Sequence, residues 1–454
     1  SGRTHSRILG HSTCRMVVSP VDLAQSLDRD ILRGAFNMTD QSTLQTYNSW
    51  IAIDIAKDSN VVAVETSAGK KSTFRVANSY VGHDRLMAVI HDLPQPCRIC
   101  FEPTGDYHRT LGYRLISEGF EVCLVSSVAA ARYRDAMFNS WDKNDPKDAH
   151  VLLQLLKQGL VQKYVDPLVA GNLDLQEISK TYYHLTLART RLHHSIHTHY
   201  LPLYFPEMGK WLCSTRADWW LAYMTRFPCP SAITQLSLDE FCVEASPIIG
   251  RKVNKQAKLV ELYETAKTSI GLPVSADSNA CSTFKMQLQR YQELNAQRMQ
   301  LETLASKAMA TMPEYAILKS VPGIGPVIAL TILAEAGDLR RFDHHRQFLK
   351  YCGLDLAKSQ SGNMRGKERL SKRGNARLRL ALWIATTIAI RMRENTFRDK
   401  YARYMKTDPL DADRRRKALT AVTAKMARVI YGLVKSNELY KCKFEALPSG
   451  STSH

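Results

Sequence analysis

The order of hydrophobic patterns between residues 49 and 138 constrains the fold of this 454-residue chain more than any other feature. Alternating apolar and polar residues at 49–55, 60–65 and 72–77 predict three strands joined by tight turns. Helices and strands then alternate: helix 82–93, strand 97–102, helix 107–118, strand 121–126 and a helix from 128. The order β-β-β-α-β-α-β-α predicts a mixed α/β domain in which helices cover a central sheet.

Three hairpin-linked strands followed by alternating helices and strands describe the ribonuclease-H-like fold. The rest of the chain is expected to be mainly helical, with a helix at 149–156 and an almost wholly apolar helix at 376–390. A heptad seam begins at 175, and a second helix at 283–309 would pair with it or with another protomer. Residues 201–280, rich in Pro and Trp, look like an irregular helical insertion.

The two long helices are predicted from the spacing of their apolar residues. The first seam is Leu175, Ile178, Tyr182, Leu185, Arg189, Leu192 and Ile196, and the second helix carries Leu294, Leu301, Leu304 and Ala308. Simple core packing would give the same stripes.

The charge balance indicates a polyanionic partner. The chain holds 62 Lys and Arg against 43 Asp and Glu, a net charge of +19, which favours a nucleic acid. Eight basic residues in 358–379 are opposed only by Glu368, and 391–417 holds ten. No run approaches the roughly 18 apolar residues of a transmembrane helix, and no signal-peptide pattern is present, so we expect a cytoplasmic protein that does not bind membranes.

The ten cysteines are expected to be reduced thiols, as is usual in a long chain without a secretion signal. Cys97 and Cys100 form a CxxC pair, but they fall inside a predicted strand, where residues three apart face opposite sides. We therefore expect no metal or redox role for this pair.

Two carboxylates fall on the strands of the predicted sheet. Asp54 lies in the first strand at a half-buried position, and Glu102 ends the fourth strand before a strand-to-helix turn. In a ribonuclease-H-like sheet these strands are neighbours, so both side chains would converge on one site. Hard divalent cations such as Mg²⁺ prefer oxygen ligands of this kind, although either residue alone would also suit a solvated surface.

Asp145 and Asp148 stand at the start of the helix that follows the sheet. Asp145 before Pro146 is a good N-terminal cap, and Asp148 suits the helix dipole, so capping alone would explain both. Their spacing also places both carboxylates on one helix face. Taken with Asp54 and Glu102, the four acids favour a metal site.

Ser361 is the candidate nucleophile. It lies in a Ser/Gly segment ahead of five cationic residues, Arg365, Lys367, Arg369, Lys372 and Arg373. A serine among cations can attack a phosphodiester while the guanidinium groups offset the phosphate charge, but an ordinary loop has the same composition. Ser359 is an alternative nucleophile, and Ser371 is interpreted as the N-cap of the next helix.

A glycine-rich turn and a histidine cluster complete the candidates. Gly323 and Gly325 lie between two helical patterns, as in a helix-hairpin-helix, where backbone N–H groups bind phosphate without reading bases. A tight turn between packed helices needs the same glycines. The histidines are interpreted as a solvated helix face; they are His193, His194, His197 and His199.

Six ordered blocks together resemble the DEDD-type insertion-sequence transposases. Three lie in the α/β domain, at 51–57, 101–105 and 144–149, and three in the helical part, at 318–326, 360–362 and 370–375. The likeness covers about 49–435. The chain departs from the family pattern by Pro146-Lys147 between the two aspartates and by a longer insertion at 201–280.

The resemblance implies an RNA-guided recombinase that excises and inserts an insertion sequence. A structured noncoding bridge RNA would pair with donor and target double-stranded DNA. Mg²⁺ would be bound by the four acids, and Ser361 would form a phosphoserine link to DNA. The protein would act in the bacterial cytoplasm, associated with the nucleoid, as a homo-oligomer from dimer to tetramer in which one protomer's acids face another's serine.

We therefore expect five segments, of which the first and the last lie outside the resemblance. They are a flexible extension at 1–48, a RuvC-like catalytic domain at 49–165, a coiled-coil region with an insertion at 166–310, a C-terminal transposase domain at 311–435 and a tail at 436–454.

Two other functions remain open from the residues alone. One is a metal-dependent RuvC-like nuclease or resolvase, in which water is the nucleophile and Ser361 only binds phosphate. The other is a non-enzymatic nucleic-acid-binding scaffold, against which the four intact acids argue. A covalent protein–DNA adduct would separate the recombinase from the nuclease.

Overall fold

The computed structural model describes residues 46–442 except 104, 139–144, 213–217, 251–254, 358–359, 362–363 and 366–368. The flexible extension expected at 1–48 lies, up to residue 45, outside these residues. The chain divides into two compact units. One comprises the described residues up to Leu173 with Asp338–Thr386 and Asp399–Ser436, and the other comprises Asp174–Gly337, Thr387–Arg398 and the residues from Asn437.

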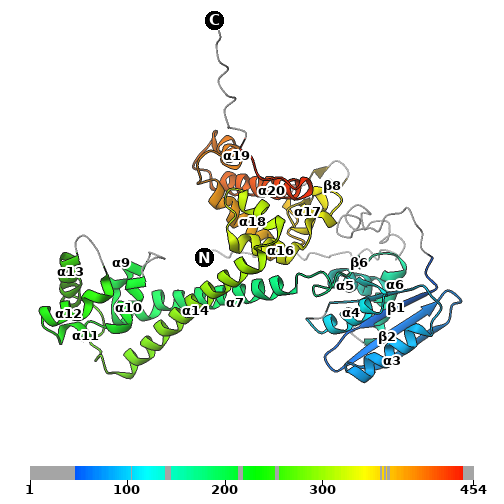
Figure 1. Ribbon diagram of the computed structural model, residues 1–454, viewed down its shortest axis with the longest axis horizontal. Helices are drawn as coiled ribbons and strands as arrows, with labels where there is room; N and C mark the ends of the chain where they lie inside the picture. Colours follow the sequence, from blue (N-terminus) through cyan, green and yellow to red (C-terminus); the bar gives the residue numbers. More distant parts are fainter. Residues whose placement is uncertain are drawn as a thin grey trace, which may run out of the picture. The chain divides into compact units, whose positions relative to one another are not determined.

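The first unit contains a six-stranded sheet with helices on both faces (Figure 1). Its strands lie in the order β3-β2-β1-β4-β5-β6. Their bounds are β1 Ser49–Asp54, β2 Ser59–Thr66, β3 Lys71–Ala77, β4 Cys97–Phe101, β5 Glu121–Leu124 and β6 Gln162–Lys163. β2 runs antiparallel to β1 and β3, whereas β1, β4 and β5 are parallel neighbours. The predicted order of strands and helices is confirmed.

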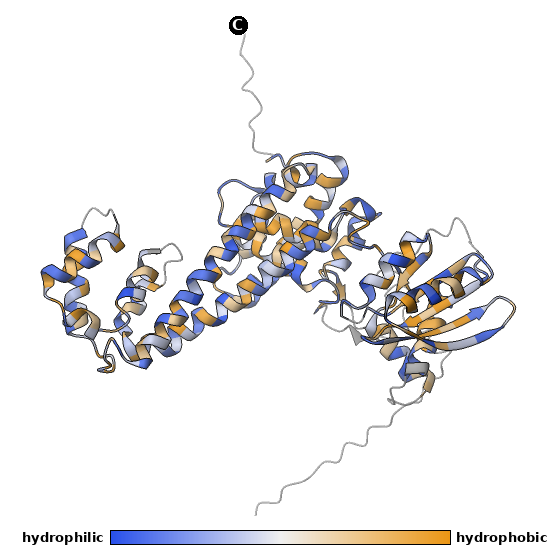
Figure 2. Ribbon diagram, turned by 60° about the horizontal axis from the view of Figure 1, so that its bottom comes forward, coloured by the Kyte–Doolittle hydropathy of each residue, from blue (hydrophilic) through white to orange (hydrophobic). Residues whose placement is uncertain are grey.

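Four helices cover this sheet, namely α3 (Tyr80–His91), α4 (His108–Ser117), α5 (Ser127–Phe138) and α6 (Asp145–Lys157). Alternate strand residues separate two cores. Ile51 and Ile53 of β1 pack toward α3 and α4, whereas Ala52 packs toward α5 and α6. Cys97 and Cys100 also face opposite cores and are free thiols. Figure 2 shows the apolar residues concentrated along these strands.

Helix α6 is fixed to the sheet at several points. It packs against β1, β2 and β4. The Cys100 thiol on β4 lies 3.5 Å from the carbonyl oxygen of Leu152. At the end of the helix, the Lys157 ammonium bonds the buried Glu65 carboxylate of β2 at 2.6 Å. The first turn of α6 is therefore held in a fixed position relative to the central strands.

The second unit contains the two long helices, α7 (Leu173–Ser195) and α14 (Asn279–Met309). They pair with each other in an antiparallel sense. Tyr182 donates to Glu302 at 2.8 Å, and Arg189 donates to Asn295 at 2.6 Å. The predicted stripe on the second helix is partly wrong, because Leu304 is 52% exposed and Ala308 is exposed as well, whereas the neighbouring Ala305 and Met309 are buried.

The histidines lie where α7 passes into a π-helical turn, η1 (Ile196–Tyr200). His194, His197 and His199 are exposed, as expected of a solvated face. His193 is half-buried with its ring 5.9 Å from that of Tyr291.

The insertion between the long helices is a compact helical body with its own aromatic core. Its elements are α8 (Leu201–Tyr204), η2 (Pro206–Met208), α9 (Gly209–Leu212), α10 (Asp218–Arg226), α11 (Ser231–Thr234), α12 (Leu238–Ile249) and α13 (Lys255–Lys267). Phe227 contacts both Tyr223 and Phe241, with ring centroids 5.2 and 5.3 Å away. Aromatic residues thus supply the core that the irregular pattern of 201–280 did not reveal.

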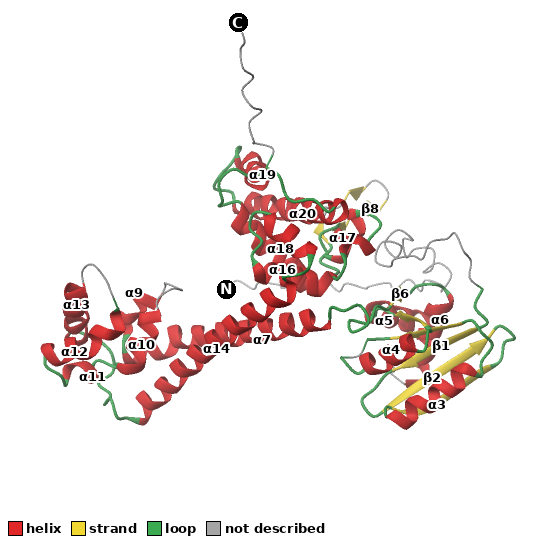
Figure 3. Ribbon diagram, in the orientation of Figure 1, coloured by secondary structure: helices red, strands yellow, loops and turns green. Residues whose placement is uncertain are grey.

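The remaining elements are mainly helical, with a short β-ribbon (Figure 3). They are α15 (Pro313–Ser320), α16 (Pro326–Ala336), η3 (Leu339–Arg341), α17 (His345–Tyr351), β7 (Leu356–Ala357), β8 (Gln360–Ser361), β9 (Met364–Arg365), β10 (Arg369–Leu370), α18 (Ala376–Ala389), α19 (Thr396–Met405) and α20 (Ala412–Ser436). α20 packs against α17 and η3, and Tyr431 donates to the carbonyl oxygen of Phe342 at 2.9 Å. Within the described part of the chain, no helix combines the length and apolarity needed to cross a bilayer.

Candidate active site

Asp54 and Glu102 lie at the same edge of the sheet. Asp54 is the last residue of β1, and Glu102 follows directly after β4. In the parallel register Ile53 lies opposite Phe101, so the two acids occupy the next position of the ladder. Both are half-buried. Their convergence, predicted from strand order alone, follows from this register.

The alternation of side chains along a strand also determines on which face of the sheet these two acids lie. Ala52 and Cys100, each two residues earlier, belong to the core beneath α5 and α6. The same parity directs Asp54 and Glu102 toward that face. The first turn of α6, which carries Asp145 and Asp148, packs on it.

Asp148 is 5% exposed, and Arg134 of α5 neutralises its charge. The Arg134 Nε atom lies 2.5 Å from Asp148 Oδ1. The two atoms approach without the alignment of a hydrogen bond, and neither has another hydrogen-bond partner. A charge-to-charge contact therefore offsets the desolvation of this carboxylate. The sequence did not predict the contact of Arg134 with Asp148, because the position of an arginine on an amphipathic helix does not indicate which acid it pairs with.

The donor set suits a hard cation only in part. Carboxylate oxygens from two strand ends and one helix are ligands that Mg²⁺ accepts, and Asp148 Oδ1 is a buried acceptor without a hydrogen bond. Among the side chains that the structure describes, which exclude Asp145, no three acids, histidines or cysteines gather closely enough to hold a metal ion. The four-acid site thus stays a prediction.

Ser361 lies near the end of a two-stranded ribbon. β8 pairs with β9 so that Ser361 faces Met364, which leaves only two residues between them. β7 pairs with β10 in a second two-stranded sheet, with Leu356 opposite Leu370, and these strands flank the first pair in the sequence. We call the two pairs together the ribbon. The structure describes no side chains in 358–368, and it does not describe the backbone of Ser359 and Lys367 either. The candidate nucleophile is therefore placed by its backbone.

The base of this ribbon is closed by Ser371 and Asp355. The Ser371 N–H donates to the Asp355 carbonyl oxygen at 2.9 Å, and the Ser371 hydroxyl bonds the Asp355 carboxylate. The interpretation of Ser371 as a helix N-cap is wrong. Asn375 caps α18 instead, because its side-chain oxygen accepts from the Leu378 N–H at 3.0 Å.

A second closure lies beside the first. Arg379 of α18 donates to the carbonyl oxygens of Cys352 and Lys372 at 3.0 and 3.3 Å, which links the two chain segments at the ribbon base. Gly374 has a φ of 141°, and a Cβ there would lie 2.5 Å from the Tyr351 carbonyl oxygen. Only glycine permits this approach of the two backbones.

The basic residues flanking the ribbon are exposed where their side chains are described, namely at Arg369, Lys372 and Arg373. Arg365 is placed in β9 by its backbone alone. These positions leave cationic groups available to a phosphate.

The glycine-rich turn joins α15 to α16 as predicted. Gly323 has a φ of 89°, which favours glycine, and Gly325 is the N-cap of α16. A Cβ on Gly325 would meet nothing within 4 Å, so the backbone there is open to a ligand.

Comparison with known proteins places these blocks in one family. The DEDD-type IS110 transposase model matches residues 51–206, and the model for the transposase IS116/IS110/IS902 family matches residues 315–402. The chain belongs to the IS110 family of DEDD-type insertion-sequence transposases. The first match covers the sheet with all four acids and α7, and the second covers Gly323, Gly325 and the serine ribbon.

Relatives from several bacteria agree with this placement. The transposase for insertion sequence element IS1111A of Coxiella burnetii is 31% identical over 125 residues, which is 28% of this chain and 34% of that protein. A probable family 20 transposase of Pseudomonas aeruginosa is 30% identical over 124 residues, 27% of this chain and 36% of its own length. The match thus spans about a third of either relative.

A third relative aligns over more of its length. The mini-circle putative transposase for IS117 of Streptomyces coelicolor is 25% identical over 318 residues, 66% of this chain and 74% of that protein.

Replacing Arg134 by Gln should lower the free energy of unfolding, because the buried Asp148 carboxylate loses its counter-charge. Breaking a buried ion pair costs about 3–5 kcal/mol, and we expect the lower end because the Arg134 side chain keeps 16% exposure. Calorimetric unfolding of the full chain measures the change. The exposed Arg132 of the same helix is the control, and its replacement by Gln should have little effect. Equal stability of both variants would contradict the buried pair.

Replacing Ser371 by Ala should loosen the ribbon, because the Asp355 carboxylate loses its hydroxyl donor. A hydrogen bond to a charged group is worth about 1.5–3 kcal/mol, so amide hydrogen exchange across 356–370 should accelerate about tenfold or more. Ser371→Thr retains the hydroxyl and should exchange at nearly the wild-type rate. Unchanged exchange in Ser371→Ala would show that the bond does not hold the ribbon.

Proposed function

We propose that this chain is a DNA recombinase that moves an insertion sequence by cleaving and rejoining DNA strands. The observation that carries the proposal is the pairing of Asp54 and Glu102 at adjacent strand ends, inside a chain that two transposase family models match. The strand order β3-β2-β1-β4-β5, with β2 antiparallel, supports a RuvC-like assignment of the α/β domain.

We assign the acids Asp54, Glu102, Asp145 and Asp148 to an Mg²⁺ site. Such an ion would supply Lewis-acid stabilisation of charge on the reacting phosphate. For Asp148 to contribute an oxygen, its contact with Arg134 must loosen. Arg134 thereby keeps the buried carboxylate compensated whenever a cation is not bound.

Ser361 would act as the nucleophile. Its Oγ atom bonds the phosphorus of a DNA phosphodiester, and the bond from phosphorus to the leaving deoxyribose oxygen breaks. The serine proton passes to a base and the leaving oxygen takes up a proton. Attack by a hydroxyl of the incoming strand reverses these changes and releases the serine, so no external energy source is needed. Arg369, Lys372 and Arg373 would offset phosphate charge during both steps.

Guidance by a structured RNA and assembly into a dimer or tetramer complete the proposal, and both rest on the family resemblance. An assembly would let the acids of one protomer serve the serine of another. Sequencing of RNA that co-purifies with the chain identifies the guide.

Replacing Asp54 or Glu102 by Ala should abolish strand cleavage while leaving DNA binding largely intact, because metal stabilisation of the transition state is worth several kcal/mol. Cleavage of labelled DNA in Mg²⁺ measures the effect. Asp58, an exposed acid in the turn after β1, is the control, and Asp58→Ala should cleave normally. Cleavage within tenfold of wild type in both site variants would contradict the metal-site assignment.

Ser361 should become covalently joined to DNA. Denaturing gels with labelled DNA should show a shifted protein band for the wild type and none for Ser361→Ala. A mixture of Asp54→Ala and Ser361→Ala proteins should regain partial activity, because some composite sites in the assembly remain intact.

Two results would replace this assignment. If the band persists in Ser361→Ala and disappears in Ser359→Ala, the nucleophile is Ser359. If neither serine matters and cleavage continues, the chain is a metal-dependent nuclease that uses water.

A further inference from the structure

Three helices of the first unit carry cations that lie outside the serine ribbon in the sequence. Lys400 and Arg403 lie one turn apart on α19, and Arg428 lies on α20. Arg346 and His345 belong to α17, which packs against α20. Arg403, Arg428 and Arg346 are exposed, whereas Lys400 and His345 are half-buried. We call Arg346, Lys400, Arg403 and Arg428 the α17/α19/α20 cationic surface.

The groups of this surface are close enough to repel one another. Burial, and then the positive charges of Arg428 and Arg403, lower the pKa of the Lys400 ammonium. Burial, and then His344, Arg428 and Arg346, lower the pKa of His345. Arg428 therefore acts on both neighbouring helices, and like charges rather than acids surround it.

Carboxylates do not compensate this surface. In the part of the chain that the structure describes, no Asp or Glu forms an ion pair with Lys400, Arg403, Arg428 or Arg346. Holding like charges together costs free energy of folding. A polyanion bound across them would relieve that cost.

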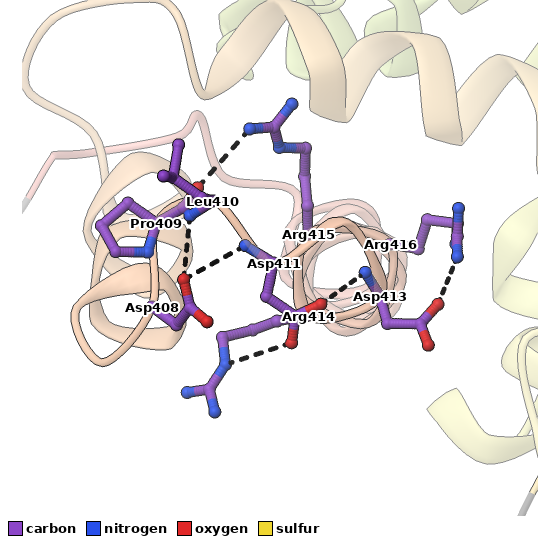
Figure 4. A network of polar contacts seen from close by, with 8 residues as sticks. All are labelled: Asp408, Pro409, Leu410, Asp411, Asp413, Arg414, Arg415 and Arg416. Atoms are coloured by element: carbon purple, nitrogen blue, oxygen red, sulfur yellow. Dashed lines mark hydrogen bonds and ion pairs between the residues drawn. The ribbon is translucent and has the colours of Figure 1, made fainter.

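The beginning of α20 provides the contrast (Figure 4). There Arg414 pairs with Asp411 at 3.9 Å, and Arg416 pairs with Asp413. Asp411 also accepts the Asp413 N–H at 2.8 Å, so both acids are built into the helix start. Arg416 is exposed like Arg428 and Arg414 is half-buried, but the charge of both is already neutralised within the protein.

We propose that the α17/α19/α20 cationic surface binds the phosphate backbone of double-stranded DNA. Long cationic side chains on α17 and α20, which pack against each other, and on α19 suit phosphates, which give affinity without base recognition. The proposal rests on the proposed function only in taking DNA as the polyanion.

The test compares two double variants of the full chain that lose the same charge. Lys400→Gln with Arg428→Gln removes two uncompensated cations, and Arg414→Gln with Arg416→Gln removes two paired ones. Binding of a random-sequence DNA duplex is measured between 50 and 200 mM salt. Each lost phosphate contact should reduce the slope of log affinity against log salt by about 0.9. We expect a reduction of about 2 in the first variant and almost none in the second.

Equal slopes in the two variants would overturn the proposal, as would a reduced slope for structured RNA with no change for DNA. If the Lys400/Arg428 variant does not fold, Arg346→Gln with Arg403→Gln decides by the same criterion, since both side chains are exposed. The readout is independent of strand cleavage. A reduced DNA slope in a chain that forms no serine adduct would support DNA binding by this surface and contradict the recombinase. A serine adduct together with an unchanged slope would support the recombinase and contradict DNA binding by this surface.

Discussion

The parallel pairing of β1 with β4 is the constraint on which the candidate active site depends. These strands lie in the middle of the sheet, and helices bury both of their faces. Buried backbone groups must be hydrogen-bonded, so the register of the two strands is strongly fixed, and a slip by one residue would exchange the two cores. Asp54 and Glu102 inherit their alignment from that register. Each sits where the apolar part of its strand ends, so a carboxylate can be rigidly positioned without being fully desolvated.

In the first unit, some basic side chains pair with acids of the fold, whereas others remain available to bind a polyanion. Lys157 is tied to Glu65, Arg134 to Asp148, and Arg416 to Asp413. Each of these cations neutralises an acid of the fold, so it adds little to the field outside the protein. The excess of 62 basic over 43 acidic residues must therefore be carried by the others. The family blocks contain part of that excess beside the ribbon, and the α17/α19/α20 cationic surface contains another part.

Local periodicity was enough to predict the strands, the covering helices and the opposite facing of Cys97 and Cys100, because burial on two faces leaves a clear pattern. Pairing between distant segments was harder to predict. Arg134 with Asp148 and Ser371 with Asp355 are contacts of polar side chains, which follow no period. Leu304 and Ala308 were misplaced because the buried residues beyond Leu294 are Ala305 and Met309, which follow the 3.6-residue turn of a straight helix rather than the heptad. Aromatic burial in the insertion depends on tertiary packing that its irregular pattern did not predict.

The ribbon and the sheet hold their candidate active-site residues in position by different contacts. An isolated two-stranded ribbon is marginal in water, so the position of Ser361 must be determined by what holds the ribbon base. Ser371 bonds Asp355 across that base, and Arg379 ties it to α18 through two carbonyl oxygens. Rigidity thus comes from the helical body, whereas the end of the ribbon carries Ser361, which in the proposed mechanism would have to approach a phosphate closely. On a helix, the preceding and following turns would surround a nucleophile and restrict the approach of a phosphate. A clamped ribbon gives precise support at one end and open access at the other.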